Sequence, residues 1–315
     1  MKICYSSDAH ASDMIPSSRS DDYFEAFKKK FKYMINYCLD NNIQRIIHAG
    51  DLFDKHNAKY KVTNFIMEEL NLWRSMTGSF TFLMIAGQHD MQYHSSWQGT
   101  PYESLISAGL AFHLNKEPYE MFTHANDEET GDLILQPVHI YGCSYGEETP
   151  EIQNDKVYNI LVVHKMIVHE KLWEGQENYT PALGFLRSNK FNLIIAGDNH
   201  QPFTIYHRSK NLTMCGSIMR KSIDQKDYQP HFYITDLVTN EHMRVPFPIE
   251  KDVFKEEVIE NKKQKVLIDK FAESLKNSTV STLKFADRVN RAIEKNELEP
   301  HVITAITEVM EAVNG

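Results

Sequence analysis

Short apolar runs alternate with longer amphipathic segments along the first part of the chain. The apolar runs are rich in β-branched and aromatic residues, and most end in Gly, Ser or His, which is typical of buried strands. They are KICYSS, IQRIIHAG, SFTFLMIAG, VHIYGCSYG, VYNILVVH and FNLIIAG. Residues 22–39 and 61–75 carry apolar side chains at helical spacing and are predicted helices. This order predicts β-α-β units around a largely buried sheet.

The pattern changes twice further along the chain. Four strand-like runs follow one another closely and are predicted to pair antiparallel: QPFTIYH, NLTMCGS, HFYITDL and HMRVPF. From Lys251 to Gly315 the strands vanish, the charge density rises and helical patterns take over. The sequence therefore predicts a layered α/β domain over residues 1–250 and a separate helical module over residues 251–315.

Composition indicates a soluble globular protein. The chain has 315 residues, of which 42% are hydrophobic, enough for one large or two modest cores. Its longest apolar runs fall far short of the ~20 residues that a membrane span needs, and the amino terminus lacks a signal-peptide layout. We therefore expect a cytoplasmic protein without a membrane partner. The net charge of −9 argues against nucleic-acid binding by a large basic surface alone.

The four cysteines are far apart and form no C-x-x-C pair. This spacing favours small core residues over a zinc knuckle or a disulfide framework.

Acidic, imidazole and amide side chains follow five of the predicted strands, in the segments SDAH, GDLFD, GQHD, VVHK and GDNH. A single Asp or His at a strand end is more often a hydrogen-bonded structural group. Open α/β sheets bind ligands at the carboxyl ends of their strands, so five such segments together predict one site. Because the set contains Asp, His and an amide but no Cys, it suits Mn²⁺, Fe²⁺ or Mg²⁺ better than structural zinc. It offers enough ligands for two ions.

The order of these segments resembles a known family. The motifs D-x-H, G-D, G-N-H-D, H and G-H-x-H mark the calcineurin-like metallophosphoesterases, and this chain has DAH, GDLFD, GQHD, His164 and GDNH. The resemblance covers residues 1–250 and implies a four-layer α/β/β/α sandwich with a C-terminal helical module. Within the superfamily, GDLFD, the Asp after His89 and CGSIMRKS are most similar to SbcD-type nuclease subunits of DNA double-strand-break repair, in a short form such as bacteriophages carry.

The resemblance also implies a role for each strand-end residue. Asp51 would bridge two Mn²⁺ ions, with Mg²⁺ as the alternative metal. The first ion would be held by Asp8, His10 and His200, and the second by Gln88, His164 and Asp198. A metal-bridging hydroxide would attack the phosphodiester bond, and His89, oriented by Asp90, would protonate the leaving alkoxide.

Two residues depart from the family pattern. Gln88 stands where the family has Asn, and Asp198 stands where it has the first His of its last motif. Both departures fall on the second ion, so ligation there is expected to shift or weaken. Asp54, the second acid of GDLFD, is interpreted as a loop cap.

The loop MQYHSSW follows the third motif. Its Tyr93 and His94 are candidate substrate contacts, because exposed aromatic faces stack on unpaired bases. Anchoring of the loop is the plainer interpretation of Tyr93 and of Trp97.

The leading hypothesis is a metal-dependent DNA exonuclease or endonuclease subunit acting on DNA ends in recombination or repair. The implied partners are DNA, an SbcC-type coiled-coil ATPase and a second copy of the chain. The apolar stripes of VLIDKFAESL and VITAITEVMEAV fit docking of such an ATPase on the C-terminal helices, although they fit packing on the core equally well. Two alternatives remain: a phosphoesterase for small phosphodiesters or phosphoproteins, and a non-catalytic scaffold on the same fold.

Overall fold

The computed structural model describes residues 1–251 apart from 79, 127–132 and 173–174, together with residues 253–255, 258, 293 and 303. The chain divides into two compact units: Met1–Ser17 with Asp21–Lys251, and Ser18–Ser20 with Asp252–Gly315. Nearly all of residues 251–315 lie outside the described residues, and so do the helices and the ATPase-docking role predicted for them. The fold below is that of the first unit.

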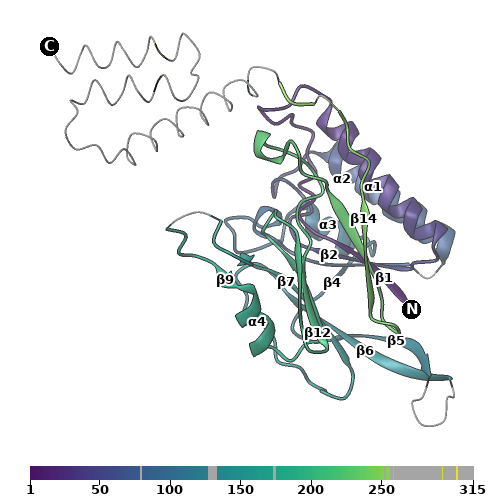
Figure 1. The fold of residues 1–315 in the computed structure, drawn as a ribbon. Helices are drawn as coiled ribbons and strands as arrows, with labels where there is room; N and C mark the ends of the chain where they lie inside the picture. Colours follow the sequence, from purple (N-terminus) through teal and green to yellow (C-terminus); the bar gives the residue numbers. More distant parts are fainter. Residues whose placement is uncertain are drawn as a thin grey trace, which may run out of the picture. The chain divides into compact units, whose positions relative to one another are not determined.

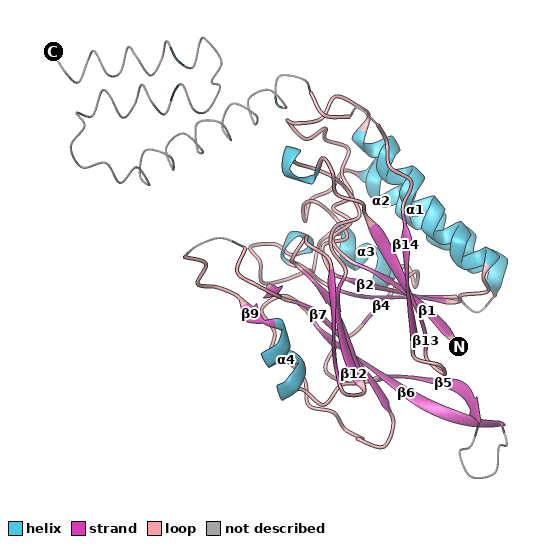
Figure 2. Cartoon of the chain, in the orientation of Figure 1, coloured by secondary structure: helices cyan, strands magenta, loops and turns pink. Residues whose placement is uncertain are grey.

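Two six-stranded sheets form the first unit (Figures 1 and 2). The first sheet has the order β14-β13-β1-β2-β3-β4. Strands β1 to β4 pair parallel to one another, whereas β13 pairs antiparallel with both β1 and β14. The bounds are β1 Lys2–Ser6, β2 Arg45–Ala49, β3 Thr81–Ile85, β4 Phe112–His113, β13 His231–Asp236 and β14 Glu241–Pro246.

The second sheet has the order β11-β12-β10-β7-β6-β5. Its four inner strands are parallel, and the edge strands β5 and β11 pair antiparallel with their neighbours. A two-stranded sheet joins β8 Ile167–Val168 to β9 Thr180–Pro181. The six bounds are β5 Tyr119–Asn126, β6 Leu133–Cys143, β7 Tyr158–His164, β10 Leu193–Gly197, β11 Phe203–His207 and β12 Lys210–Met214.

The helices begin and end at residues whose chemistry favours those positions. Helix α1, Tyr23–Asp40, follows Asp22, whose carboxylate accepts a hydrogen bond from the Glu25 amide at 3.0 Å and so caps the helix. Helix α2, Tyr60–Thr77, ends at Gly78, which has the left-handed φ of 66° common at helix ends. The remaining helices are α3 Pro101–Ser107, α4 Ala182–Ser188 and the 3₁₀ turns η1 Gln88–Asp90 and η2 Ile223–Gln225.

Three buried apolar clusters separate four layers. Successive side chains of a strand face opposite sides, so Cys4 of β1 packs toward α1 and α2 while Ile3 and Tyr5 pack toward the second sheet. In the second sheet, Ile160 of β7 joins that inter-sheet core, and Leu161 joins the third cluster with α4. The order helices, sheet, sheet, helix confirms the α/β/β/α sandwich implied by the sequence.

Every predicted strand and both predicted helices are present, within a few residues of the expected bounds. Strand β5 was not predicted, and the two closely spaced hairpins belong to different sheets. Strand β12 pairs antiparallel with β11 but parallel with β10, so the antiparallel prediction holds on one side only. All four cysteines are buried and unpaired, which confirms them as core residues. Within the described ranges, no helix combines the length and apolarity that crossing a bilayer requires.

Candidate metal centre

The turns that follow the strands are held in an uncommon backbone conformation. Asp8, His10, Asp51 and Asp198 have φ values of 50°, 44°, 54° and 89°. A positive φ is uncommon for residues other than Gly and persists where the surroundings enforce it, often at functional sites. Here the enforcing contacts include hydrogen bonds from the Asp8 amide to the Gly50 carbonyl and from the His10 amide to the Asp51 carbonyl, both at 3.0 Å.

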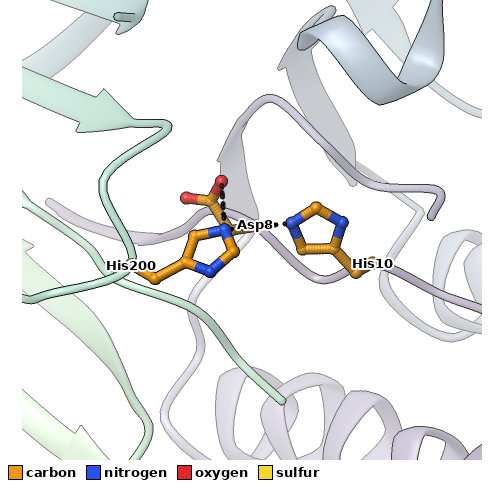
Figure 3. A group of neighbouring side chains, drawn as sticks. All are labelled: Asp8, His10 and His200. Atoms are coloured by element: carbon orange, nitrogen blue, oxygen red, sulfur yellow. Dashed lines mark hydrogen bonds and ion pairs between the residues drawn. The ribbon is translucent and has the colours of Figure 1, made fainter. Parts of the chain in front are cut away.

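The structure brings together the three residues predicted for the first ion (Figure 3). One ligand atom each from Asp8, His10 and His200 lies within 4.8 Å of the other two. His200 Nε2 is 3.7 Å from Asp8 Oδ1 and 3.1 Å from His10 Nε2. Two imidazole nitrogens converging beside a buried carboxylate form a donor set that suits a divalent transition metal. Their role as ligands remains a prediction.

Asp51 belongs to a second group of close donor atoms, which shares Asp8 with the first. Asp8, Asp51 and His164 also lie within 4.8 Å of one another. Asp51 Oδ2 is 3.5 Å from His164 Nε2 and 3.8 Å from His10 Nε2. His164 Nδ1 is 2.7 Å from the carbonyl of Ala49; donation of its proton there leaves Nε2 to face Asp51. The central place of Asp51 is the one that a bridging ligand requires.

Several polar atoms of the centre are buried without a hydrogen-bond partner among the described residues. They are Asp51 Oδ2, His164 Nε2 and Gln88 Oε1. Burying polar atoms without a partner costs about 1–3 kcal/mol each, and more for charged groups. A divalent cation would satisfy all three, so the residues present fit a metal centre.

The electrostatics of the protein chain alone also indicate a place for positive charge. Burial, reinforced by Asp51, raises the pKa of Asp8 to about 7. Burial alone would raise the pKa of Asp51 and lower that of His164. Their mutual attraction outweighs it, holding the pKa of Asp51 well below its usual range and raising the pKa of His164 to about 10. A protonated His164 thus supplies the charge that a cation would supply when bound.

His89 lies at the open side of the centre, with 40% of its side chain exposed. Its Nδ1 is 2.8 Å from the main-chain carbonyl of Asp54, and its Nε2 is 4.0 Å from Asp51 Oδ2. The main-chain amide of His89 donates to Asp51 Oδ1 at 2.8 Å. The imidazole is therefore fixed at one nitrogen and faces the centre with the other.

The hydrogen bonds described for the Asp90 carboxylate are to the main chain and not to the His89 imidazole, so its role in orienting His89 stays a prediction. The buried Asp90 carboxylate accepts hydrogen bonds from three main-chain amides, those of Leu52, Phe53 and Gly87, at 3.3, 3.0 and 3.0 Å. These bonds tie the loop after β3 to the loop after β2. The reason is geometric: neighbours on a tight 3₁₀ turn point apart, so Asp90 faces the interior while His89 faces the site.

Asp54 is more than the predicted loop cap. Besides its carbonyl contact with His89, its carboxylate forms an ion pair with Lys221 and lies 3.5 Å from His10 Nδ1. Asp54 thereby links a predicted ligand to the predicted proton donor. Sequence reasoning missed this role and Lys221, although both residues lie in segments singled out for the resemblance, GDLFD and CGSIMRKS.

Two glycines leave room for the centre, and this gives a testable prediction. A Cβ at Gly87 would lie 2.1 Å from Asp51 Oδ1, and one at Gly50 would lie 2.3 Å from His164 Nδ1. We expect Gly87→Ala to displace Asp51, to cost ~1–3 kcal/mol of stability through overpacking and to weaken Mn²⁺ binding at least ~10-fold. Thermal unfolding and calorimetric Mn²⁺ titration measure both effects.

The matched control is Gly184→Ala in α4, where a Cβ meets nothing closer than 4.0 Å. This control should leave Mn²⁺ binding unchanged and, by favouring the helix, raise stability by up to ~1 kcal/mol. If Gly87→Ala matched the parent in both measurements, the close packing around Asp51 would be disproved.

A cleft of about 900 Å³ adjoins the centre. Gln88, His164 and Asp198 form one wall, and Tyr145 and Tyr179 contribute to the lining. This volume lies within the range of sites for small ligands.

Tyr93 and His94 lie in the loop after η1, at φ values of 49° and 56°. Tyr93 is 92% exposed, and the His94 ring is 6.1 Å from the ring of Tyr145, one of the cleft residues. His94 thus lies beside the cleft, Tyr93 is open to solvent, and the contact of both with substrate remains a prediction.

Comparison with known proteins identifies a matching family and similar sequences. The model of the family described as calcineurin-like phosphoesterase matches residues 1–202. The chain is 26% identical over 220 residues to the DNA double-strand break repair protein Mre11 of Methanosarcina mazei, covering 69% of this chain and 33% of that protein. It is 23% identical over 219 residues to the protein of the same name from Haloferax volcanii, covering 66% of this chain and 43% of that protein.

The chain thus spans less than half the length of these two relatives. Among solved structures, a dimetal phosphatase from Danio rerio is 12% identical with a TM-score of 0.48, covering 79% of this chain and 99% of that chain. The expectation of a short bacteriophage form stays a prediction.

Proposed function

Since the chain belongs to the calcineurin-like phosphoesterase family, we propose that its metal centre hydrolyses phosphodiester bonds of DNA, as an exonuclease or endonuclease subunit acting on DNA ends in repair or recombination. The observation that carries the proposal is the convergence of carboxylate and imidazole groups around Asp51 Oδ2 and His164 Nε2, two buried atoms without a hydrogen-bond partner among the described residues. The similarity to two DNA double-strand break repair proteins supports DNA as the substrate.

The proposed metal is Mn²⁺, in two positions, with Mg²⁺ as the alternative. Asp8, His10 and His200 would hold one ion, and His164 with Gln88 would hold the other, while Asp51 would contact both. When bound, such ions neutralise phosphate oxygens and lower the pKa of water so that it can act as the nucleophile.

The protein chain supplies the proton for the leaving group. His89 Nδ1 donates to the Asp54 carbonyl, so Nε2 is the nitrogen that faces the centre. In the protonated imidazole both nitrogens carry a proton, and Nε2 can release its own to the departing oxygen without breaking the bond to Asp54. Asp54 thus positions His89 throughout the reaction.

A second groove favours a strand of nucleic acid, rather than a small molecule, as the substrate. A groove of about 1130 Å³ lies between residues 56–63 and 92–104, which continue directly from the second and third motifs. Tyr60 and Tyr93 line it and are 86% and 92% exposed, with Lys59 and Lys61 beside them. Aromatic faces next to ammonium groups suit the stacked bases and phosphates of a single strand.

This groove gives a direct prediction for binding. Replacing both Tyr60 and Tyr93 by Ala removes two stacking faces, each worth ~1–3 kcal/mol, and is expected to weaken binding of a fluorescent oligo-dT strand at least ~10-fold. Fluorescence anisotropy measures the affinity. The control is Tyr206→Ala, an exposed tyrosine on β11 that does not line the groove. Equal affinities for parent, double variant and control would remove the groove from the proposal.

A phosphoesterase for small phosphodiesters or phosphoproteins is the second candidate, favoured by the 900 Å³ cleft beside Gln88 and His164. Parallel assays with Mn²⁺ separate the two functions: linear duplex DNA, single-stranded DNA, bis-p-nitrophenyl phosphate and a phosphoserine peptide. The proposal predicts degradation of DNA, lost on chelation. Turnover of the small substrates without DNA cleavage would favour the second candidate, and no hydrolysis at all would favour a non-catalytic scaffold.

The proposal extends to partners and location. A cytoplasmic location is part of the proposal. Docking of an SbcC-type coiled-coil ATPase on residues 251–315 and formation of a homodimer remain proposals that the described residues do not address.

A further inference from the structure

The two side chains that depart from the family pattern contact each other. Gln88 Nε2 donates a hydrogen bond to Asp198 Oδ1 at 2.9 Å. Gln88 begins η1 after β3 of the first sheet, and Asp198 directly follows β10 of the second sheet. The contact therefore joins the two sheets at the edge of the metal centre.

This bond decides which end of the Gln88 amide faces inward. An ionised carboxylate only accepts hydrogen bonds, so it binds the amide nitrogen and not the amide oxygen. Because both atoms sit on the same planar carbon, Oε1 then points away from Asp198. Oε1 is the atom that is buried without a hydrogen-bond partner among the described residues. The contact with Asp198 therefore leaves the oxygen of Gln88, and not its nitrogen, free to accept a cation.

The Asp198 carboxylate is not a member of the clustered donor groups, although it lies close enough to raise the pKa values of Asp8 and His164. Three groups of donor atoms lie within 4.8 Å of one another in the described part of the chain, and Asp198 belongs to none of them. Its main-chain amide donates to both carboxylate oxygens of Asp8 at 3.2 Å. Asp198 thus holds one residue of the centre through its main chain and another through its side chain.

We propose that Asp198 is a positioning residue and not a metal ligand: its carboxylate fixes the Gln88 amide so that Oε1 joins Asp51 and His164 as the donors of the second ion. This inference rests on the proposed metal centre and deepens it. The longer Gln side chain is required, because an Asn would end about 1.5 Å earlier and would lose the 2.9 Å contact with Asp198.

A double-mutant cycle on Mn²⁺ binding tests the proposal. Calorimetry and the electron paramagnetic resonance of free Mn²⁺ give the affinity and the number of ions for the parent, Gln88→Leu, Asp198→Ala and the double variant. If Asp198 acts only through Gln88, each single variant weakens the second ion by ~10–100-fold, as loss of a ligand or of its supporting contact typically does. The double variant is then weaker than Gln88→Leu by no more than the effect of one lost negative charge.

The general effect of removing a negative charge is measured separately. Glu147 lines the same cleft and its carboxylate bonds to the main-chain amide of Ser144. Glu147→Gln reports the factor by which one lost charge lowers Mn²⁺ affinity. The affinity losses of the variants that lack Asp198 are divided by this factor. Asp198→Asn serves as a second variant of unchanged shape. Its amide can bond to either end of Gln88, so it is expected to weaken the second ion less than Asp198→Ala does.

The outcomes are distinct. Multiplicative losses in the double variant, beyond the Glu147 factor, would make Asp198 a ligand and overturn the inference while leaving the metal centre intact. Unchanged binding in Asp198→Ala would also overturn it. Failure of the parent protein to bind any Mn²⁺ would instead remove the proposed function on which the inference rests.

Discussion

Asp51→Asn is expected to abolish tight Mn²⁺ binding at both positions and to lower phosphodiester hydrolysis by ~10³-fold or more, because the cations supply several kcal/mol of transition-state stabilisation. Asp51 is fully buried, and its Oδ2 faces His10 and His164 at 3.8 and 3.5 Å without a hydrogen-bond partner among the described residues. Asn keeps the shape but removes the negative charge and one of the two oxygens. The bond from the His89 amide to Oδ1 can persist, so the fold should survive.

Calorimetric Mn²⁺ titration and hydrolysis of bis-p-nitrophenyl phosphate measure the two losses. The control is Asp236→Asn, a carboxylate that pairs with the amino terminus at 3.4 Å and lies outside the centre. Two bound ions or parental activity in Asp51→Asn would contradict the bridging role.

His89→Ala is expected to lower DNA hydrolysis by ~10²–10⁴-fold, the usual contribution of a general acid. The loss should be smaller for bis-p-nitrophenyl phosphate, because a nitrophenolate leaves without needing a proton. Mn²⁺ binding should stay at the parental level, since His89 Nδ1 is held by the Asp54 carbonyl and Nε2 lies 4.0 Å from Asp51 Oδ2. Steady-state rates on both substrates, together with calorimetry, measure this split.

The control for His89 is His207→Ala at the end of β11. His89, His10 and Asp54 also form a group of close donor atoms, so a ligand role for His89 is a definite alternative. A drop in Mn²⁺ affinity that accompanies equal losses on both substrates would establish that alternative and reject the proton donor.

Local signals predicted most of the fold. The buried strands are runs of β-branched residues, and α1 begins where Asp22 caps it. Local sequence patterns could not predict that the two hairpins belong to different sheets. This depends on pairings such as β1 with β13, which are more than 200 residues apart in sequence. Strand β5 was missed because its strand conformation depends on pairing with β6 and is not predicted by its own sequence.

The site was predicted as a set of residues and not as a set of contacts. The strand ends identified Asp8, His10 and Asp51, since each follows a buried strand directly. The pair of Asp54 with Lys221 and the pair of Gln88 with Asp198 join segments 167 and 110 residues apart. No spacing rule reports such contacts, because they depend on how the two sheets meet.

The most direct test of the metal centre is a titration of metal-stripped protein with Mn²⁺, in which bound ions and hydrolysis of linear DNA are followed in the same samples. The structure predicts two bound ions, no hydrolysis before the first is added, and a rate that rises as the second position fills. Hydrolysis that persists in the presence of a chelator, or an absence of Mn²⁺ binding, would contradict the assignment of these strand-end residues to a metal-dependent phosphodiesterase.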